Sequence, residues 1–303
     1  MTHHLGELAA LLTAVFWTIT ALAFASASKK IGSMIVNLLR LIVGFLFLTI
    51  FVYFYRGQWL PLDATPQAWF YLTLSGLIGF VFGDLCLFQA FVVIGPRVSM
   101  LLMALSPPIT AFIGWIVLGE TLSSMSWAGM ILTISGIALV VLKRHSPAEN
   151  EGSFRKVKLN YPVWGILLGV GGALGQAAGL VLSKVGMKDY DTFAATQIRV
   201  ITGIIGFSII FTILGFWKEA FRAMTYRKPM LQLSLGAFFG PFLGVSFSLI
   251  SIKYADTGIA ATIMALVPVM IIPPSMILYK EKVTMKEIIG AIIAVSGVAL
   301  FFL

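Results

Sequence analysis

Long apolar runs separated by short polar segments dominate the chain. A membrane-crossing helix needs about 20 apolar residues. Runs of that length cover residues 5–26, 33–55, 69–91, 97–118, 124–142, 161–183, 192–216, 231–252, 258–279 and 284–303. They are continuously apolar, whereas strands of a membrane barrel alternate apolar and polar residues. Because lipid cannot satisfy bare backbone groups, the runs must be helices. The pattern therefore predicts an all-α integral membrane protein with ten transmembrane helices.

The second half of this pattern repeats the first. An offset of 161 residues takes Pro107 to Pro268, and an offset of 159 takes Arg40 to Arg199. Each copy holds five predicted spans. Because five is odd, two directly joined copies must cross the membrane in opposite orientations, which makes an inverted repeat. The expected divisions are a first five-helix repeat over 1–143, a connecting loop over 144–160 and a second five-helix repeat over 161–303.

Composition strengthens the membrane interpretation. The 303 residues are 59% hydrophobic and only 11% charged, too few charges for a soluble domain of this length. The connections between the runs are short, so no soluble catalytic domain fits. Cys86 is the single cysteine, which excludes an internal disulfide. We expect a multi-pass protein of the plasma or inner membrane.

The net charge of +9 comes mainly from the loops and indicates contact with lipid headgroups rather than nucleic acid. Four Lys and Arg residues fall on the face that carries both termini and fifteen on the other face. The positive-inside rule then places both termini outside the cytoplasm. We expect the first run to remain as a helix and not to be removed as a signal peptide. No Lys or Arg precedes that run, and it aligns with residues 161–183.

Short motifs recur at matched places in the two copies. In the first copy these are Leu105-Ser106-Pro107, Leu118-Gly119-Glu120-Thr121-Leu122, Trp127-Ala128-Gly129 and Ser135-Gly136. In the second they are Leu266-Val267-Pro268, Lys280-Glu281-Lys282-Val283-Thr284, Gly290 and Ser296-Gly297. Together they resemble the EamA-type branch of the drug/metabolite transporter superfamily. The resemblance implies a secondary transporter of small metabolites, often an exporter, with a central cavity lined by helices 1, 3, 4, 6, 8 and 9. It also implies cytoplasmic termini, against the Lys and Arg distribution.

Prolines occupy matched points within two of the spans. Pro107 and Pro268 each lack an N–H group and displace the carbonyl four residues earlier, which belongs to Met103 or Met264. Helices broken at matched positions in two repeats are the best sequence indication of a transporter site. A structural kink without further function is the alternative.

Polar and aromatic residues form a stripe on the first span, where Thr13, Trp17 and Thr20 share a face. Trp17 corresponds to Gln176 in the second copy. Such a stripe suits a small amphipathic or aromatic solute. The alternative is helix packing, with the hydroxyls bonded to the backbone. The predicted cavity residues are Thr13, Trp17, Thr20, Asp84, Phe88, Met103, Ser106, Gln176 and Met264.

Asp84 is the only acidic residue well inside a predicted span. A charge at that depth is a functional candidate by default. Asp84 and Arg40 each lie seven residues from the same basic face, about 10 Å deep at the helical rise per residue. Three roles therefore stay open for Asp84: an ion pair with Arg40, a carrier of a coupling proton, or a substrate contact. Arg199 has no acidic mate because Asp84 corresponds to Val245. Its partner could be Gln197, a helix C-terminus or an anionic solute.

Small residues and a cap complete the structural expectations. Glycines four apart predict close backbone approach of helices in lipid, at Gly79 and Gly83, at Gly171, Gly175 and Gly179, and at Gly236, Gly240 and Gly244. Thr284 and Glu287 predict a capping box. Glu120 and Glu281 occupy matched loops, where local hydrogen bonding or headgroup contact is the expected role.

These observations favour a secondary transporter that moves a small metabolite, an amino acid or a related compound, by alternating access. Export is the expected direction, and proton coupling through Asp84 is one hypothesis. The alternatives are a lipid flippase on the same scaffold, a channel and an intramembrane enzyme. An enzyme needs a nucleophile with a base, or metal ligands, but His3, His4 and His145 lie in tails or loops. We expect no cofactor and no metal; the expected partners are a substrate and lipids, in a monomer or homodimer.

Overall fold

The computed structural model describes residues 5–118, 123–141, 161–254, 260, 263–279 and 283–301. Every regular element within these residues is a helix, which confirms the all-α prediction. Seven helical segments among them are long and apolar enough to cross a membrane. They are Leu5–Ile31, Ser33–Arg56, Pro66–Val93, Gly95–Ile113, Val163–Met187, Thr192–Leu214 and Arg227–Tyr254. The shorter apolar helices Trp127–Val140 and Val267–Leu278 fall in two further predicted runs. The count of ten spans stays a prediction, and Glu120, Glu281 and the predicted loop over 144–160 lie outside the described residues.

Several predicted spans consist of more than one element. In chain order the helices are α1 (Leu5–Ile31), α2 (Ser33–Arg56), α3 (Pro66–Gly76), the π-helix η1 (Leu77–Gly83), α4 (Asp84–Val93), α5 (Gly95–Met103), α6 (Ser106–Leu118), α7 (Ser124–Val141), α8 (Val163–Met187), α9 (Thr192–Leu214), α10 (Trp217–Ala223), α11 (Arg227–Ala237), the π-helix η2 (Phe238–Gly244), α12 (Val245–Tyr254), α14 (Val267–Met270), α15 (Ile272–Tyr279) and α16 (Met285–Phe301). The sequence pattern did not predict α10 or the two π-helices. The π-helices themselves occupy matched positions, 161 residues apart.

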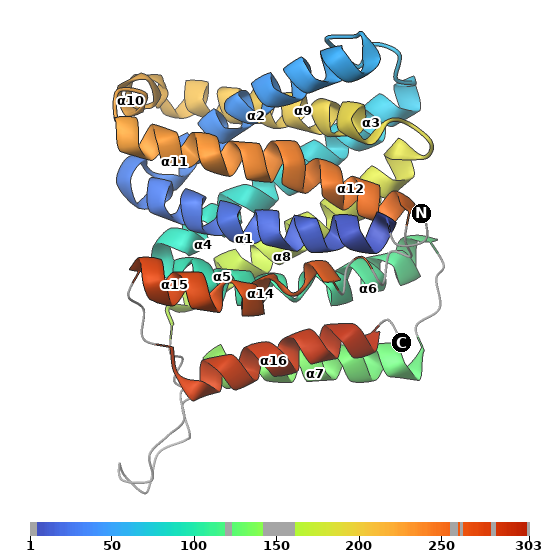
Figure 1. Ribbon diagram of the computed structural model, residues 1–303, viewed down its shortest axis with the longest axis vertical. Helices are drawn as coiled ribbons and strands as arrows, with labels where there is room; N and C mark the ends of the chain where they lie inside the picture. Colours follow the sequence, from blue (N-terminus) through green and yellow to red (C-terminus); the bar gives the residue numbers. More distant parts are fainter. Residues whose placement is uncertain are drawn as a thin grey trace, which may run out of the picture.

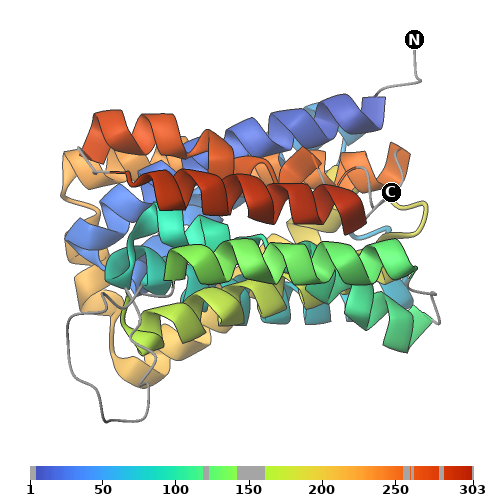
Figure 2. The ribbon, with the colours of Figure 1, turned by 90° about the horizontal axis from the view of Figure 1, so that it is seen from below.

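The two copies interlock, and their contacts come in matched pairs. Helix α1 packs against α11, η2 and α12, and its counterpart α8 packs against α3, η1 and α4. Equivalent helices also pack against each other, α2 with α9 and α7 with α16. Figures 1 and 2 both show α7 and α16 side by side at one edge of the bundle. Helix α1 begins and α16 ends at the same end of the bundle (Figure 1).

Glycines mark the closest helix contacts, as predicted. A Cβ atom on Gly175 of α8 would lie 2.4 Å from the Cα atom of Gly83, and one on Gly179 would lie 3.1 Å from the Cα atom of Gly79. In the other half, the glycines of α11 and η2 face large side chains of α1 instead. Gly236, for example, faces the ring of Phe24. The copies therefore meet backbone to backbone on one side and side chain to backbone on the other.

Helical elements end and begin beside both of the matched prolines. Helix α5 ends at Met103, and α6 begins at Ser106, the residue before Pro107. In the second copy a turn at residues 265–266 precedes α14, which begins at Val267, the residue before Pro268. Proline lacks the N–H group that would close the preceding turn, and the helix is interrupted there in both copies.

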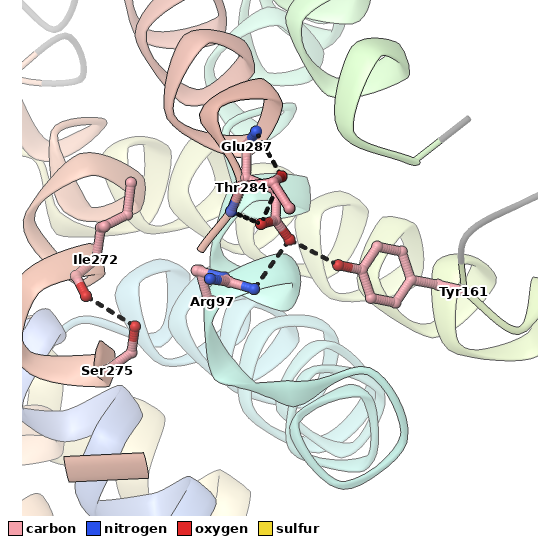
Figure 3. Close-up of polar contacts among 6 residues, drawn as sticks. All are labelled: Arg97, Tyr161, Ile272, Ser275, Thr284 and Glu287. Atoms are coloured by element: carbon pink, nitrogen blue, oxygen red, sulfur yellow. Dashed lines mark hydrogen bonds and ion pairs between the residues drawn. The ribbon is translucent and has the colours of Figure 1, made fainter. Parts of the chain in front are cut away.

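The predicted capping box is also confirmed, and it joins the two copies (Figure 3). The Thr284 amide donates to Glu287 Oε2 at 2.7 Å, and the Glu287 amide donates to Thr284 Oγ1 at 3.4 Å. Glu287 Oε1 accepts from Arg97 of α5 at 2.9 Å and from the Tyr161 hydroxyl at 3.0 Å. One carboxylate thus caps α16 and holds α5 and the start of α8 beside it.

Replacing Glu287 by alanine removes the cap and both contacts. We expect the free energy of unfolding to fall by about 1 kcal/mol, because caps and partly exposed ion pairs each contribute modestly. Denaturant titration in mixed micelles measures this. Lys286→Ala is the matched control, since its side chain is exposed, and it should stay within about 0.5 kcal/mol. Equal losses for the two variants would contradict the capping role.

A second polar cluster joins the copies at the opposite end of the bundle, where α2 ends (Figure 1). Arg56 donates to Asp63 at 2.6 Å, and Tyr190, between α8 and α9, donates its hydroxyl proton to Asp63 at 2.8 Å. Slight burial opposes ionisation of Asp63, but the hydrogen bonds from Tyr190 and Arg56 outweigh it and lower its pKa. The cluster is therefore intact at neutral pH and weakens only in acid, as Asp63 becomes protonated.

Candidate functional site

The two copies enclose a cavity at the centre of the bundle. Its empty volume is about 1190 Å³ with the mouth included, and its walls come from α1, α2, η1, α4, α5, α6, α8, α9, η2, α12 and α14. The sequence predicted twelve residues for the cavity, the Asp84–Arg40 pair and the helix breaks, and eleven of them line this cavity: Trp17, Thr20, Arg40, Asp84, Phe88, Met103, Ser106, Pro107, Gln176, Met264 and Pro268. The two matched helix breaks and the polar stripe of α1 therefore border the same cavity.

Thr13 is the residue that does not line the cavity. Its side chain is fully buried, and its hydroxyl donates to the carbonyl of Ala9 at 2.8 Å. This is the backbone-bonded alternative for the stripe residues. Thr13 is therefore a packing residue of α1, one turn beyond the cavity wall.

A buried polar network surrounds Asp84. Arg40 donates to Asp84 Oδ2 and forms an ion pair with it, and Gln176 Nε2 donates to Oδ1 at 2.8 Å. Asn37 Nδ2 donates to the Asp84 backbone carbonyl at 3.2 Å, and Arg40 Nε donates to Asn37 Oδ1 at 3.1 Å. Arg40 and Asp84 are only 3% and 4% exposed. Of the three roles left open for Asp84, this geometry contains the ion pair with Arg40, and Gln176 adds a contact from the second copy.

The π-helices place the residues that follow them on the cavity wall. Asp84 comes directly after η1, and Val245 comes directly after η2. Both line the cavity, at positions that correspond between the copies. A π-turn carries one more residue than an α-turn and is frequent at functional sites. The two copies thus use the same local geometry to present an acid in one wall and an apolar side chain in the other.

Aromatic rings surround the charged groups. The Cζ atom of Arg40 lies 4.6 Å from the ring centroid of Phe88 and 5.7 Å from those of Phe24 and Phe80. The rings of Phe88 and Phe91 stack at 5.4 Å. With methionines, Leu87 and Leu180 in the remaining wall, the lining is mostly apolar with a few convergent polar groups. That combination is typical of sites for small amphipathic molecules.

The sequence prediction missed several residues of the cavity wall, and two of these form a matched pair. Phe80 and Pro241 both line the cavity, and they correspond under the offset of 161. The match was visible, but a phenylalanine in an apolar run carries no chemical signal. The sequence identified Arg199 only as an arginine without an acidic partner, and the structure places it in the cavity wall. Among the described residues, no group of three or more His, Cys, Asp or Glu is placed to hold a metal ion.

Comparisons with known proteins agree with this architecture. The model of the EamA-like transporter family matches residues 4–142 and again residues 163–303. An uncharacterized transporter of Bacillus subtilis, YvbV, is 26% identical over 64% of this chain and 59% of its own length. An uncharacterized membrane protein of Saccharomyces cerevisiae, YMR253C, is 22% identical over 61% of this chain and 46% of its own. The chain thus spans about half the length of these relatives. A crystal structure of a further protein aligns with a TM-score of 0.68 over 97% of this chain and 95% of its own, at 18% identity, a likeness of fold alone.

Proposed function

Because the chain belongs to the EamA-like transporter family, we propose that this integral multi-pass membrane protein is a secondary transporter of a small metabolite. The central cavity carries the proposal, because it lies where the two copies meet and where both helix breaks converge. Sites of this kind are typical of transporters built from two repeats. We expect the substrate to bind there and to leave the cell.

The proposal includes ten spans and an inverted repeat. The matched contacts support this: each copy's first helix packs against the third segment of the other copy. The predicted spans of the second copy follow those of the first with the same breaks. In an inverted repeat the two copies cross the membrane in opposite directions. Corresponding walls then lie on opposite sides of one central site, as alternating access requires.

Alternating access also needs contacts that open at one end while those at the other end hold. The Arg97–Glu287–Tyr161 cluster and the Arg56–Asp63–Tyr190 cluster each join the two copies, at opposite ends of the bundle. Ion pairs with partial exposure contribute little net energy, so opening either one is within reach of thermal motion and substrate binding. We propose that they open in turn.

Asp84 fits a fixed counter-ion better than the carrier of a coupling proton. Both of its carboxylate oxygens already accept hydrogen bonds, from Arg40 and Gln176. Protonation would leave Arg40 buried without a negative charge beside it, which is costly. Any gradient that drives transport then acts through another group or through exchange of substrates.

A bulky residue in the cavity should block transport. Thr110 of α6 lines the cavity, and Thr110→Trp adds an indole there. We expect metabolite flux into proteoliposomes to fall about tenfold, because overfilling a packed site costs enough to change affinity by that factor. The matched control is Ile116→Trp on the same helix, where the side chain is 63% exposed.

The substrate pool comes from untargeted metabolite profiling of cells with and without the protein. Loss of flux in Thr110→Trp and unchanged flux in Ile116→Trp would support the proposal. Equal flux in both variants and the parent would contradict it. Movement of labelled lipid between leaflets, in place of metabolite flux, would instead favour the flippase.

A further inference from the structure

The cavity wall contains a buried guanidinium without a hydrogen-bonding partner. Arg199 of α9 lines the cavity and is 3% exposed. Within the described part of the chain, no residue forms a hydrogen bond or ion pair with it, and its Nε atom is fully buried without an acceptor. Its Cζ atom lies 4.7 Å from the Phe80 ring centroid. A ring attracts the charge but does not satisfy the N–H donors, so the site lacks an acceptor.

Comparison with the first copy shows what is missing. Arg40, the counterpart of Arg199, is held by Asp84 and Asn37. The position that corresponds to Asp84 in the second copy is Val245, which also lines the cavity. Among the described lining residues the charged groups are two arginines and one aspartate, which leaves one positive charge in excess. A group from outside the protein can supply the absent carboxylate.

The absence of a side chain at position 79 makes room for the guanidinium beside the cavity. One terminal nitrogen of Arg199 lies against Gly79, at 3.2 Å from where a Cβ atom of residue 79 would be. Any larger residue at position 79 would push the guanidinium aside. Arginine presents its donors as a planar fork that matches the two oxygens of a carboxylate. The guanidinium is thus held beside Phe80 with donors unoccupied.

We propose that Arg199 binds the carboxylate of a monoanionic organic acid with an apolar body, and that this acid is the transported substrate. The inference rests on the proposed transport function and names its substrate class. The apolar body would lie against the aromatic and methionine side chains of the wall, among them Trp17, Phe88 and Met103. A dianion fits less well, because the wall has only one uncompensated positive charge.

The occupancy of Asp84 distinguishes an organic acid from an amino acid. An amino acid would also bring an ammonium group, and a buried ammonium needs a carboxylate that is free to pair with it. Both Asp84 oxygens are taken by Arg40 and Gln176, and the described lining contains no second acid. The cavity should therefore prefer a 2-oxo acid over the amino acid with the same carbon skeleton. The sequence predicts an amino acid or a related compound as the substrate, and this inference selects the related 2-oxo acids.

Matched probes test the charge preference in the full-length protein. One set is phenylpyruvate, phenylalanine and phenethylamine; the other is 4-methyl-2-oxopentanoate, leucine and isopentylamine. Binding is followed by tryptophan fluorescence in detergent, and flux by uptake into proteoliposomes. We expect the acid of at least one set to bind at least about tenfold more tightly than its amino acid and its amine. Only the acid gains a buried charge-assisted hydrogen bond without also burying an unpaired ammonium group. Equal or tighter binding of an amino acid or amine, or binding of none of the six probes, would overturn the inference.

Arg199→Gln should weaken acid binding about tenfold or more, and Arg199→Lys should retain part of it as a point charge without the fork. Arg227→Gln, on an exposed residue of α11, is the control and should change nothing. A purely structural Arg199 predicts a different result. Its removal would lower the melting temperature, whereas removal of an uncompensated buried charge should leave that temperature unchanged or raise it. A lower melting temperature with equal losses for all solutes would contradict the ligand role.

The same measurements separate the two proposals. Flux of neutral or cationic metabolites that Arg199→Gln leaves unchanged would keep the transporter and overturn the anion site. Failure of every metabolite from the profiling experiment to cross proteoliposomes would overturn both. Acid flux that depends on Arg199 and is blocked by Thr110→Trp supports both.

Discussion

Asp84→Asn is expected to lower the free energy of unfolding by about 3–5 kcal/mol, the usual cost of removing one partner from a buried ion pair. Asp84 is 4% exposed and is the carboxylate that faces Arg40. Its charge also attracts Arg199. The amide keeps the shape of the side chain but leaves two buried guanidiniums without a negative charge. Denaturant titration or thermal unfolding in mixed micelles measures the loss.

Removing Arg40, the other partner of the ion pair, should lower the free energy of unfolding by less. In Arg40→Met, Asp84 keeps the hydrogen bond from Gln176 and the attraction of Arg199. The double variant Arg40→Met with Asp84→Leu should recover more than half of the loss of Asp84→Asn, because an apolar pair can replace a buried ion pair at little cost. Additive losses in the double variant would mean that the two side chains stabilise the fold independently, and the ion-pair interpretation would be wrong.

Much of the fold was predictable because lipid leaves few choices. Continuous apolar runs must be helices in a bilayer, and a mid-span proline must break the hydrogen-bond ladder, as at Pro107 and Pro268. The Arg40–Asp84 pair was accessible for a similar reason. Two charges at equal depth in neighbouring helices have no better partner than each other. These inferences needed only helix geometry and the cost of burial.

The rest depends on tertiary contacts that sequence spacing does not contain. Nothing in the composition of Leu77–Gly83 separates a π-helix from an α-helix, yet this insertion sets the position of Asp84 on the wall. Thr13 shares a helix face with Thr20, but its hydroxyl bonds its own backbone, and spacing cannot distinguish the two arrangements. The sequence showed that Arg199 lacks an acidic partner. It could not show that Arg199 lines the cavity, because that depends on the packing of α9 against η1.

Gly175→Ala is expected to be the most disruptive single-methyl change in α8 on the side that faces η1. The new Cβ atom would lie 2.4 Å from Gly83 Cα, 2.9 Å from Gly83 N and 3.0 Å from the Ile78 carbonyl oxygen. All three are backbone atoms of η1, so no side chain can rotate away and the two helices must separate. We expect a loss of about 3 kcal/mol in the free energy of unfolding, at the upper end of the usual range for overpacking. Thermal unfolding in mixed micelles provides the measurement.

Gly171→Ala is the matched control, one turn earlier in the same helix. Its Cβ atom would meet the Cys86 Sγ atom at 3.2 Å, and a side chain can adjust by the few tenths of an ångström required. Because alanine also favours the helical backbone over glycine, this variant should be neutral or slightly stabilising. The contrast isolates backbone contact from helix propensity, since both variants make the same chemical change. If both lose stability equally, the close approach of α8 to η1 is not what holds the two copies together around the cavity.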